Sequence, residues 1–276
     1  MEGRTCKANK MTMTDKNTEL DVSPWPSDMR TWLMFLAGFA PVFALFQFLG
    51  NELESGRGEA GLLIGAIITL ATLLTDKWLT GEPFKKVFFS LGLGMPAMKG
   101  ILLALAASLL MLLIIPAVII YTKASWSMYP GWLGLLPGLF AQSGIAEETL
   151  FRGYLFRHLR KGRTFMRAAV MASIPFIAAH SILFFTMPWV IALASLLLSA
   201  IISFPLARLF EASGNTIWAP AILHFVVQSA VKVIVIEGQG LNFPVVWMLA
   251  AAVIPFVVFL YRPSVKGKND NNSAIK

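Results

Sequence analysis

The chain has 276 residues, of which 57% are hydrophobic and only 14% are charged, and its mean hydropathy is +0.69. A soluble domain carries about a quarter charged residues, so this composition excludes an ordinary soluble protein and indicates a protein embedded in a lipid bilayer. The formal net charge of +8 does not indicate a nucleic-acid partner, because the basic residues lie between apolar blocks. The single cysteine, Cys6, excludes an internal disulfide framework and a zinc cluster built from cysteines.

Apolar blocks long enough to cross a membrane follow a polar N-terminal segment. A helix needs about 20 residues to cross the hydrocarbon core. The blocks lie at residues 31–49, 61–78, 99–121, 131–156, 165–185, 188–207, 216–236 and 243–261. The block at 61–78 is the weakest of them. The pattern predicts an all-α, polytopic transmembrane helix bundle of about eight spans, with a polar intramembrane pocket.

The same pattern predicts how the chain is organised along its length. We expect a cytoplasmic polar N-terminal segment, the N-terminal transmembrane helices, a catalytic transmembrane core, the last transmembrane helix and a polar C-terminal tail. These segments cover residues 1–30, 31–130, 131–236, 237–262 and 263–276. The stretch 82–98 mixes lysines with phenylalanines, which fits an interfacial amphipathic segment and an ordinary loop equally well.

The distribution of basic residues predicts the orientation in the membrane. With eight spans and a cytoplasmic N-terminus, the outside loops hold only Arg57, Lys123 and Lys232, and nearly all other Lys and Arg residues lie on the inside. The positive-inside rule predicts this skew. We therefore expect a multi-pass protein with both termini in the cytoplasm, located in the plasma membrane.

Ionisable residues inside the predicted spans are few. Among the acidic residues, only Glu147 and Glu148 lie well inside a span, and the same span contains Arg152. Such residues are costly in lipid and usually functional. Glu148 and Arg152 are four residues apart, so they share a helix face and are expected to form an ion pair. Glu147 is turned about 100° away on that helix and is left as the unpaired acid.

Two later spans bring further polar side chains to the same region. His180 lies in one of them, and His224 lies in the other with Gln228 one helical turn beyond it. Two imidazoles and a carboxylate are a common ligand set for catalytic zinc, with an open position for water. The same set can activate water without a metal if the glutamate acts as general base. The residues leave both mechanisms open.

Three short motifs in these spans resemble those of one family. "EETLFR" matches an EExxxR motif, "FIAAH" an FxxxH motif and "HFVVQ" an HxxxN motif in which Gln228 replaces the asparagine. In this order they resemble the CAAX-protease and bacteriocin-processing family of intramembrane endopeptidases, which includes lysostaphin-resistance-like proteins. The resemblance covers about residues 131–235.

The resemblance implies a role for each site residue. Glu147 would activate water, His180 and His224 would bind that water or a Zn²⁺ ion together with Glu147, and Gln228 would take the asparagine's place as oxyanion stabiliser or water ligand. Glu148 and Arg152 would support Glu147. The substrate would be a peptide or a membrane-protein segment in the lipid bilayer. The sequence does not decide between a prenylated C-terminus, a peptide leader and a membrane-protein segment.

Two other functions, from classes other than proteases, also fit the sequence. A non-catalytic immunity or scaffold protein would keep the same fold without hydrolysis. A proton-coupled transporter would also use intramembrane Glu, His and Arg. Carriers commonly show inverted repeats and paired broken helices, and the sequence contains no visible repeat.

Overall fold

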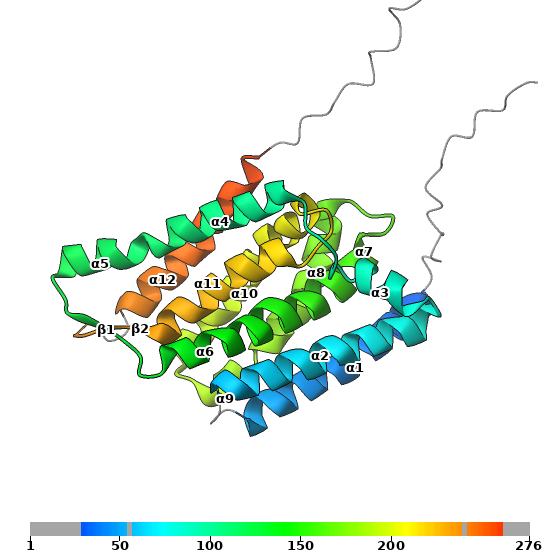
Figure 1. Ribbon diagram of the computed structural model, residues 1–276, viewed down its shortest axis with the longest axis horizontal. Coiled ribbons are helices and arrows are strands. Elements are labelled where there is room, and N and C mark those ends of the chain that lie inside the picture. Colours follow the sequence, from blue (N-terminus) through cyan, green and yellow to red (C-terminus); the bar gives the residue numbers. More distant parts are fainter. Residues whose placement is uncertain (1–28, 54–56, 239–241, 262–276) are drawn as a thin grey trace, which may run out of the picture.

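The computed structural model is a bundle of helices packed side by side along a common direction (Figure 1). It describes residues 29–53, 57–238 and 242–261. The expectations for most of segment 1–30 and for the tail 263–276 lie outside the described residues. The all-α bundle predicted from the hydropathy pattern is confirmed.

The elements follow one another in three parts. The first part comprises α1 (Met29–Glu52), α2 (Arg57–Thr80), α3 (Phe84–Ser90), α4 (Met98–Leu112), α5 (Ile114–Thr122) and β1 (Trp126–Met128). The central stretch comprises α6 (Trp132–Leu139), η2 (Phe140–Ala146), η3 (Thr149–Phe156) and α7 (Arg157–Arg160). The last part comprises α8 (Phe165–His180), α9 (Leu183–Thr186), α10 (Trp189–Ala212), α11 (Trp218–Val233), β2 (Ile234–Ile236), α12 (Asn242–Val253) and η4 (Ile254–Phe259).

Six helical stretches of the described chain are long and apolar enough, by length and composition, to cross a membrane. They are Leu33–Gly50, Gly58–Thr80, Met98–Thr122, Phe165–Thr186, Trp189–Ala212 and Asn242–Phe259. Each coincides with a predicted block. The predicted count of about eight is not confirmed. The other two blocks, 131–156 and 216–236, contain all candidate site residues except His180. In the structure, the first block is divided into α6, η2 and η3, and α11 in the second has only 16 residues.

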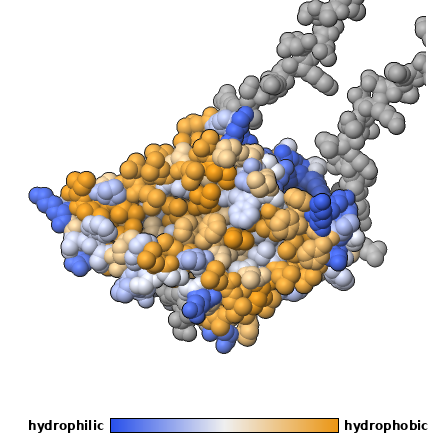
Figure 2. Space-filling view, viewed as in Figure 1, coloured by the Kyte–Doolittle hydropathy of each residue, from blue (hydrophilic) through white to orange (hydrophobic). Residues whose placement is uncertain are grey.

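The surface of the bundle is largely apolar. Figure 2 shows hydrophobic residues over most of the visible face, with hydrophilic residues gathered at the end that holds α3 and α7. Leucines such as Leu62, Leu70, Leu102 and Leu109 each expose about half or more of their side chains. Apolar side chains that point outward are expected where lipid takes the place of water.

Small residues let α2 approach the central stretch closely. A Cβ placed on Gly61 would lie 2.6 Å from the carbonyl oxygen of Gly138, and one placed on Gly65 would lie 2.7 Å from the Cβ of Ala141. Van der Waals packing of small residues is the main way in which helices associate in lipid. This contact fixes α2 against α6 and η2, directly beside Glu147 and Glu148.

At the end opposite α3 and α7, β1 and β2 pair as a short antiparallel two-stranded sheet. Trp126 pairs with Ile236, and the Ser125 hydroxyl donates a hydrogen bond to the Glu237 carboxylate. The sheet ties the segment after α5 to the segment after α11. The sequence did not predict it, because each strand has only three residues.

Candidate functional site

The central stretch that carries both glutamates has an unusual helical geometry. Residues Phe140–Ala146 and Thr149–Phe156 are wound as π-helix, so Glu147 and Glu148 lie between two wide helical segments. π-Helical turns are rare and often occur at functional sites. They change which side chains share a face, and here they leave Glu148 fully buried and Glu147 15% exposed.

Glu148 joins two helices through one carboxylate oxygen. Its Oε1 accepts a hydrogen bond from Arg152 Nη1 at 2.9 Å and another from His224 Nδ1 at 2.7 Å. The side chains of Glu148, Arg152 and His224 are 0%, 2% and 2% exposed. The predicted ion pair of Glu148 and Arg152 is therefore confirmed. The bond to His224 was not predicted, and it fixes α11 against the central stretch.

These contacts also determine which nitrogen of each histidine carries hydrogen. A carboxylate and a backbone carbonyl only accept hydrogen bonds. His224 therefore donates from Nδ1 to Glu148, and His180 donates from Nδ1 to the carbonyl oxygen of Phe176 at 2.8 Å. In the neutral form of either ring, Nε2 keeps its lone pair. Both histidines can thus accept a hydrogen bond, or bind an electrophile, through Nε2.

Glu147 faces the remaining nitrogen of His224. Its Oε2 lies 3.8 Å from His224 Nε2, which is too long for a direct hydrogen bond. A polar gap of this length is commonly bridged by water. Gln228 is half-buried, one turn beyond His224 on α11, and within the described chain no hydrogen bond links its side chain to Glu147, His180 or His224.

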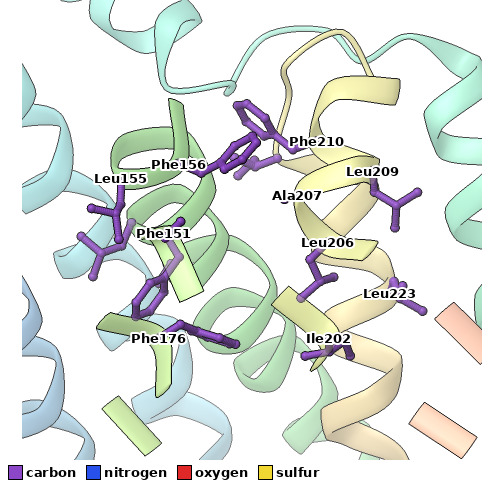
Figure 3. Packing of buried hydrophobic residues seen from close by; sticks show 14 of the residues in the cluster. Phe151, Leu155, Phe156, Phe176, Ile202, Leu206, Ala207, Leu209, Phe210 and Leu223 are labelled. Atoms are coloured by element: carbon purple, nitrogen blue, oxygen red, sulfur yellow. The ribbon is translucent and has the colours of Figure 1, made fainter. Parts of the chain in front are cut away.

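Phe176 is the common neighbour of the charged and imidazole groups. The Arg152 guanidinium carbon lies 4.6 Å from its ring centre. The rings of His180 and His224 lie 4.8 and 6.1 Å from it, both edge-on. Figure 3 shows Phe176 beside Phe151 from the central stretch, at 4.8 Å. Both histidines therefore contact one buried aromatic ring, which is 1% exposed.

The side chains of Glu147, His180 and His224, the predicted metal ligands, do not form a metal site in the structure. Within the described part of the chain, no group of three or more His, Cys, Asp or Glu side chains is placed to hold a metal ion. We therefore derive no step through zinc from the geometry. Zinc binding by Glu147, His180 and His224 stays a prediction.

A second buried ionic cluster was missed in the sequence. Asp76, at the end of α2, accepts hydrogen bonds from Arg157 Nη2 at 2.9 and 3.0 Å, and its Oδ1 lies 2.7 Å from His158 Nε2. The same Nε2 lies 2.8 Å from Arg157 Nη2, so all three side chains contact one another. The sequence signal for this cluster was Asp76, an isolated acid at the end of an apolar span, together with the basic run at 157–161. It did not reveal the pairing because 81 positions separate the partners.

The environment of this cluster shifts the pKa of two basic groups in α7 and just after it. Burial and the neighbouring Arg157 lower the pKa of His158 to about 3, although Asp76 opposes the shift. Burial and Arg157 also lower the pKa of Lys161 to about 8. His158 is therefore neutral at physiological pH, and the cluster is held by the Asp76–Arg157 ion pair.

The fold and the buried Glu–Arg–His arrangement define a multi-pass integral membrane protein with an ionisable site inside its helix bundle. Residues 129–230 match the model of the Rce1-like family, described as type II CAAX prenyl endopeptidase Rce1-like. The match bears out the resemblance of this segment to the CAAX proteases. It includes all six predicted site residues. No curated protein matches the chain significantly.

Proposed function

We propose that the protein is an intramembrane endopeptidase in which Glu147 activates water for hydrolysis of a peptide bond. The observation that carries the proposal is the pair formed by Glu147 Oε2 and His224 Nε2 at 3.8 Å, inside the segment that matches the CAAX-protease family. An acid and an imidazole at this separation, both acting on one water, form a minimal hydrolytic site.

In this proposal one water bridges the two groups from one side. A water about 2.8 Å from each atom would donate one hydrogen to Glu147 and the other to the Nε2 lone pair of His224. Its oxygen would keep its lone pairs free for attack on a carbonyl carbon. Glu147 is 15% exposed, whereas Glu148 is 0% exposed, so Glu147 is the carboxylate that we propose contacts the water.

Glu148 and Arg152 act as positioning residues in this scheme. The hydrogen bond from His224 Nδ1 to Glu148 orients the ring so that Nε2 faces Glu147. Arg152 balances the charge of Glu148, so two adjacent carboxylates can coexist in a buried site. Neighbouring carboxylates in different surroundings commonly take different roles.

The reaction then proceeds in two proton transfers. Glu147 takes a proton from the water as its oxygen attacks the carbonyl carbon of the substrate. When the C–N bond of the tetrahedral intermediate breaks, Glu147 gives that proton to the departing nitrogen. The products are a new carboxylate and a new amine. In this proposal His180 Nε2 and the Gln228 amide bind the water or the oxyanion, and Gln228 can donate a hydrogen bond as an asparagine would.

The substrate class follows from the location of the site. A site inside a lipid-facing bundle acts on a peptide held in or at the bilayer, which agrees with the CAAX type of the matched segment. We further propose that the protein resides in the plasma membrane with both termini in the cytoplasm, on the strength of the skew in basic residues.

The first experiment is to identify the substrate. Membranes containing wild-type protein and membranes containing Glu147→Gln at equal expression are compared by mass spectrometry of the peptides they release. We expect a set of peptides that is present with the wild type and with the control Glu59→Gln, which changes an exposed glutamate, but is missing with Glu147→Gln. Identical peptide sets in all three samples would refute the proposal.

The role of zinc is tested separately with the substrate so identified. A chelator that abolishes cleavage, with recovery on adding Zn²⁺, would support a metal held by Glu147, His180 and His224. Unchanged cleavage in the chelator would exclude zinc and leave the glutamate mechanism in place.

A further inference from the structure

The Arg157 side chain is bonded to the last turn of η3. In an α-helix, the amide of residue 157 would donate its hydrogen bond to the carbonyl four residues back. Here the Arg157 amide donates to the carbonyls of Arg152 and Tyr154, of which the first, five residues back, is the π-helical partner. The Gly153 carbonyl accepts a hydrogen bond from Arg157 Nε at 2.9 Å. The side chain thus supplies the bond that the amide would supply in an α-helix.

A buried acid from α2 holds the guanidinium in this position. Arg157 Nη2 donates to both carboxylate oxygens of Asp76, at 3.0 and 2.9 Å. The Asp76 side chain is 1% exposed and that of Arg157 is 17% exposed. Because the guanidinium is planar and its donors form a rigid fork, its position on Asp76 fixes the direction in which Nε points toward Gly153. The ion pair therefore supports the π-helical bond pattern at this end of η3.

The other end of η3 is held by a second buried contact. Glu148, the residue before η3, accepts hydrogen bonds from Arg152 and from His224 of α11. The eight residues of η3 therefore lie between two ionic contacts, one with α2 and one with α11. These two helices contact the central stretch from different sides (Figure 1). Neither end of η3 can turn without breaking a buried bond.

The winding of η3 determines where Glu147 points. A π-helix has more residues per turn than an α-helix, because each bond spans five residues rather than four. If η3 rewound as an α-helix, the residues before it would rotate relative to α7, which Arg160 also holds through its ion pair with Glu211 of α10. Glu147 lies two residues before η3, with its Oε2 3.8 Å from His224 Nε2. Such a rotation would turn its carboxylate away from that nitrogen.

We infer that Asp76 and Arg157 are positioning residues for Glu147, because they maintain the π winding that keeps its carboxylate facing His224. The inference rests on the proposed role of Glu147 as the base. Neither residue touches the substrate in this scheme. The Asp76 cluster thus contributes to hydrolysis from a distance, and is more than a link between α2 and α7.

Three variants of the full-length protein separate positioning from general stability. Asp76→Asn removes the charge that holds the guanidinium. Arg157→Lys keeps a cation for Asp76, but lysine lacks the planar fork that bonds Asp76 and the Gly153 carbonyl together. Because it keeps the charge pair, it carries the test if Asp76→Asn does not fold. Glu211→Gln is the matched control, since it removes the acid that pairs with the next arginine of α7, Arg160, at 2.6 Å.

The winding can be measured without any substrate. The dipeptide Gly-Tyr occurs once in the sequence, at residues 153–154. Protein labelled with carbonyl-¹³C glycine and ¹⁵N tyrosine therefore gives one directly bonded carbonyl–amide signal by NMR in detergent. We expect the Gly153 carbonyl signal to move in Asp76→Asn and in Arg157→Lys, and to stay in place in Glu211→Gln. A signal that stays in place in Asp76→Asn, or moves equally in all three variants, would overturn the inference whatever the protein hydrolyses.

Turnover of the identified substrate in liposomes tests the consequence for catalysis. We expect Asp76→Asn and Arg157→Lys to lower kcat by about 10- to 100-fold and to leave KM within about twofold, because a base displaced by about 1 Å loses up to about 10²-fold. Glu211→Gln should keep both constants within about twofold, since a partly exposed ion pair contributes little.

The outcomes distinguish this inference from the proposed function. Retained turnover in Glu147→Gln would refute the proposed function. If Glu147→Gln is inactive, a wild-type kcat in Asp76→Asn and Arg157→Lys would refute the positioning role alone. An equal loss of kcat in Glu211→Gln would also refute it, because the effect would then come from any disturbance of α7.

Discussion

At the scale of single residues, the contact that organises the candidate site is the hydrogen bond from His224 Nδ1 to Glu148 Oε1 at 2.7 Å. Through this bond, the Glu148–Arg152 ion pair orients the imidazole of His224, which faces Glu147. Metal-bound and catalytic histidines are commonly oriented by such a carboxylate on the far nitrogen. The two adjacent glutamates thus differ in both burial and partners, and this difference underlies the roles proposed for them.

The ion pair makes a prediction about stability. Replacing Arg152 by Met should lower the free energy of unfolding by about 3–5 kcal/mol, because Glu148 would be left as a buried charge without its cation. Unfolding in detergent, followed by circular dichroism, measures this. Arg167→Met changes an exposed arginine of α8 and should be close to neutral. Equal stabilities of Arg152→Met and the wild type would contradict the pairing.

The His158 cluster makes a prediction about pH. The pKa of the His158 side chain is about 3 in the folded protein and about 6.5 in an unfolded chain. Between these two pH values, the unfolded state binds a proton that the folded state does not. Stability should therefore fall as the pH is lowered below about 6.5, by about 3 kcal/mol at pH 4. The charged groups that face His158 are Asp76, Arg157 and Lys161.

The variant His158→Gln separates this effect from other titrating groups. It keeps a hydrogen-bond donor for Asp76 but has no proton to gain. Unfolding in detergent at pH 7 and pH 4 should show a smaller loss of stability in the variant than in the wild type. The same pH dependence in both proteins would rule out His158 as the titrating group.

At the scale of the elements, the central stretch from α6 to α7 is fixed from several sides. Gly138 and Ala141 contact α2, Glu148 is bonded to α11, and Gly153 lies against the carbonyl of Leu91 in the segment after α3. A Cβ on Gly153 would collide with that carbonyl. The glycine in "FRGY" is therefore needed for close packing of two backbones.

Replacing Gly153 by Ala tests this packing. Alanine favours a helix by up to about 1 kcal/mol over glycine, but the collision should lead to a net destabilisation of about 1–3 kcal/mol. Gly50→Ala is the control, because a Cβ there meets nothing within 4 Å, and it should be neutral or stabilising. Thermal unfolding in detergent measures both. A Gly153→Ala protein as stable as the wild type would show that the two backbones are not in contact.

The sequence predicted some features of these elements and not others. Six spans followed from hydropathy, and the Glu148–Arg152 pair followed from its spacing of four residues. The His224–Glu148 bond joins residues 76 positions apart, so it depends on how helices pack, which periodicity does not encode. The π-helical winding around Glu147 and Glu148 likewise arises from packing. Two of the three predicted spans that carry the site, 131–156 and 216–236, form shorter or π-helical segments that hydropathy alone does not predict.

At the scale of the whole molecule, the bundle has two different ends. Hydrophilic residues gather at the end with α3 and α7, which also holds the basic residues Arg157 and Arg160 of α7. The paired strands β1 and β2 lie at the other end. From the positive-inside rule, we predict that the basic end lies on the cytoplasmic side of the membrane.

Cysteine labelling tests the orientation. Ser127 is exposed in β1, so Ser127→Cys in a Cys6→Ser background gives a single reactive thiol. In intact cells we expect a membrane-impermeant maleimide to label it from outside. Labelling that appears only after the membrane is opened would contradict the orientation.

The measurement that tests the central claim most directly is cleavage of the identified substrate by purified protein in liposomes, comparing the wild type with Glu147→Gln. Glutamine keeps the size of the side chain but cannot take a proton from water, so turnover should fall by about 10²–10⁴-fold. His180→Ala and His224→Ala should be about as damaging if the three act as one unit, and Gln228→Ala should be milder. Turnover of Glu147→Gln close to that of the wild type would contradict the account.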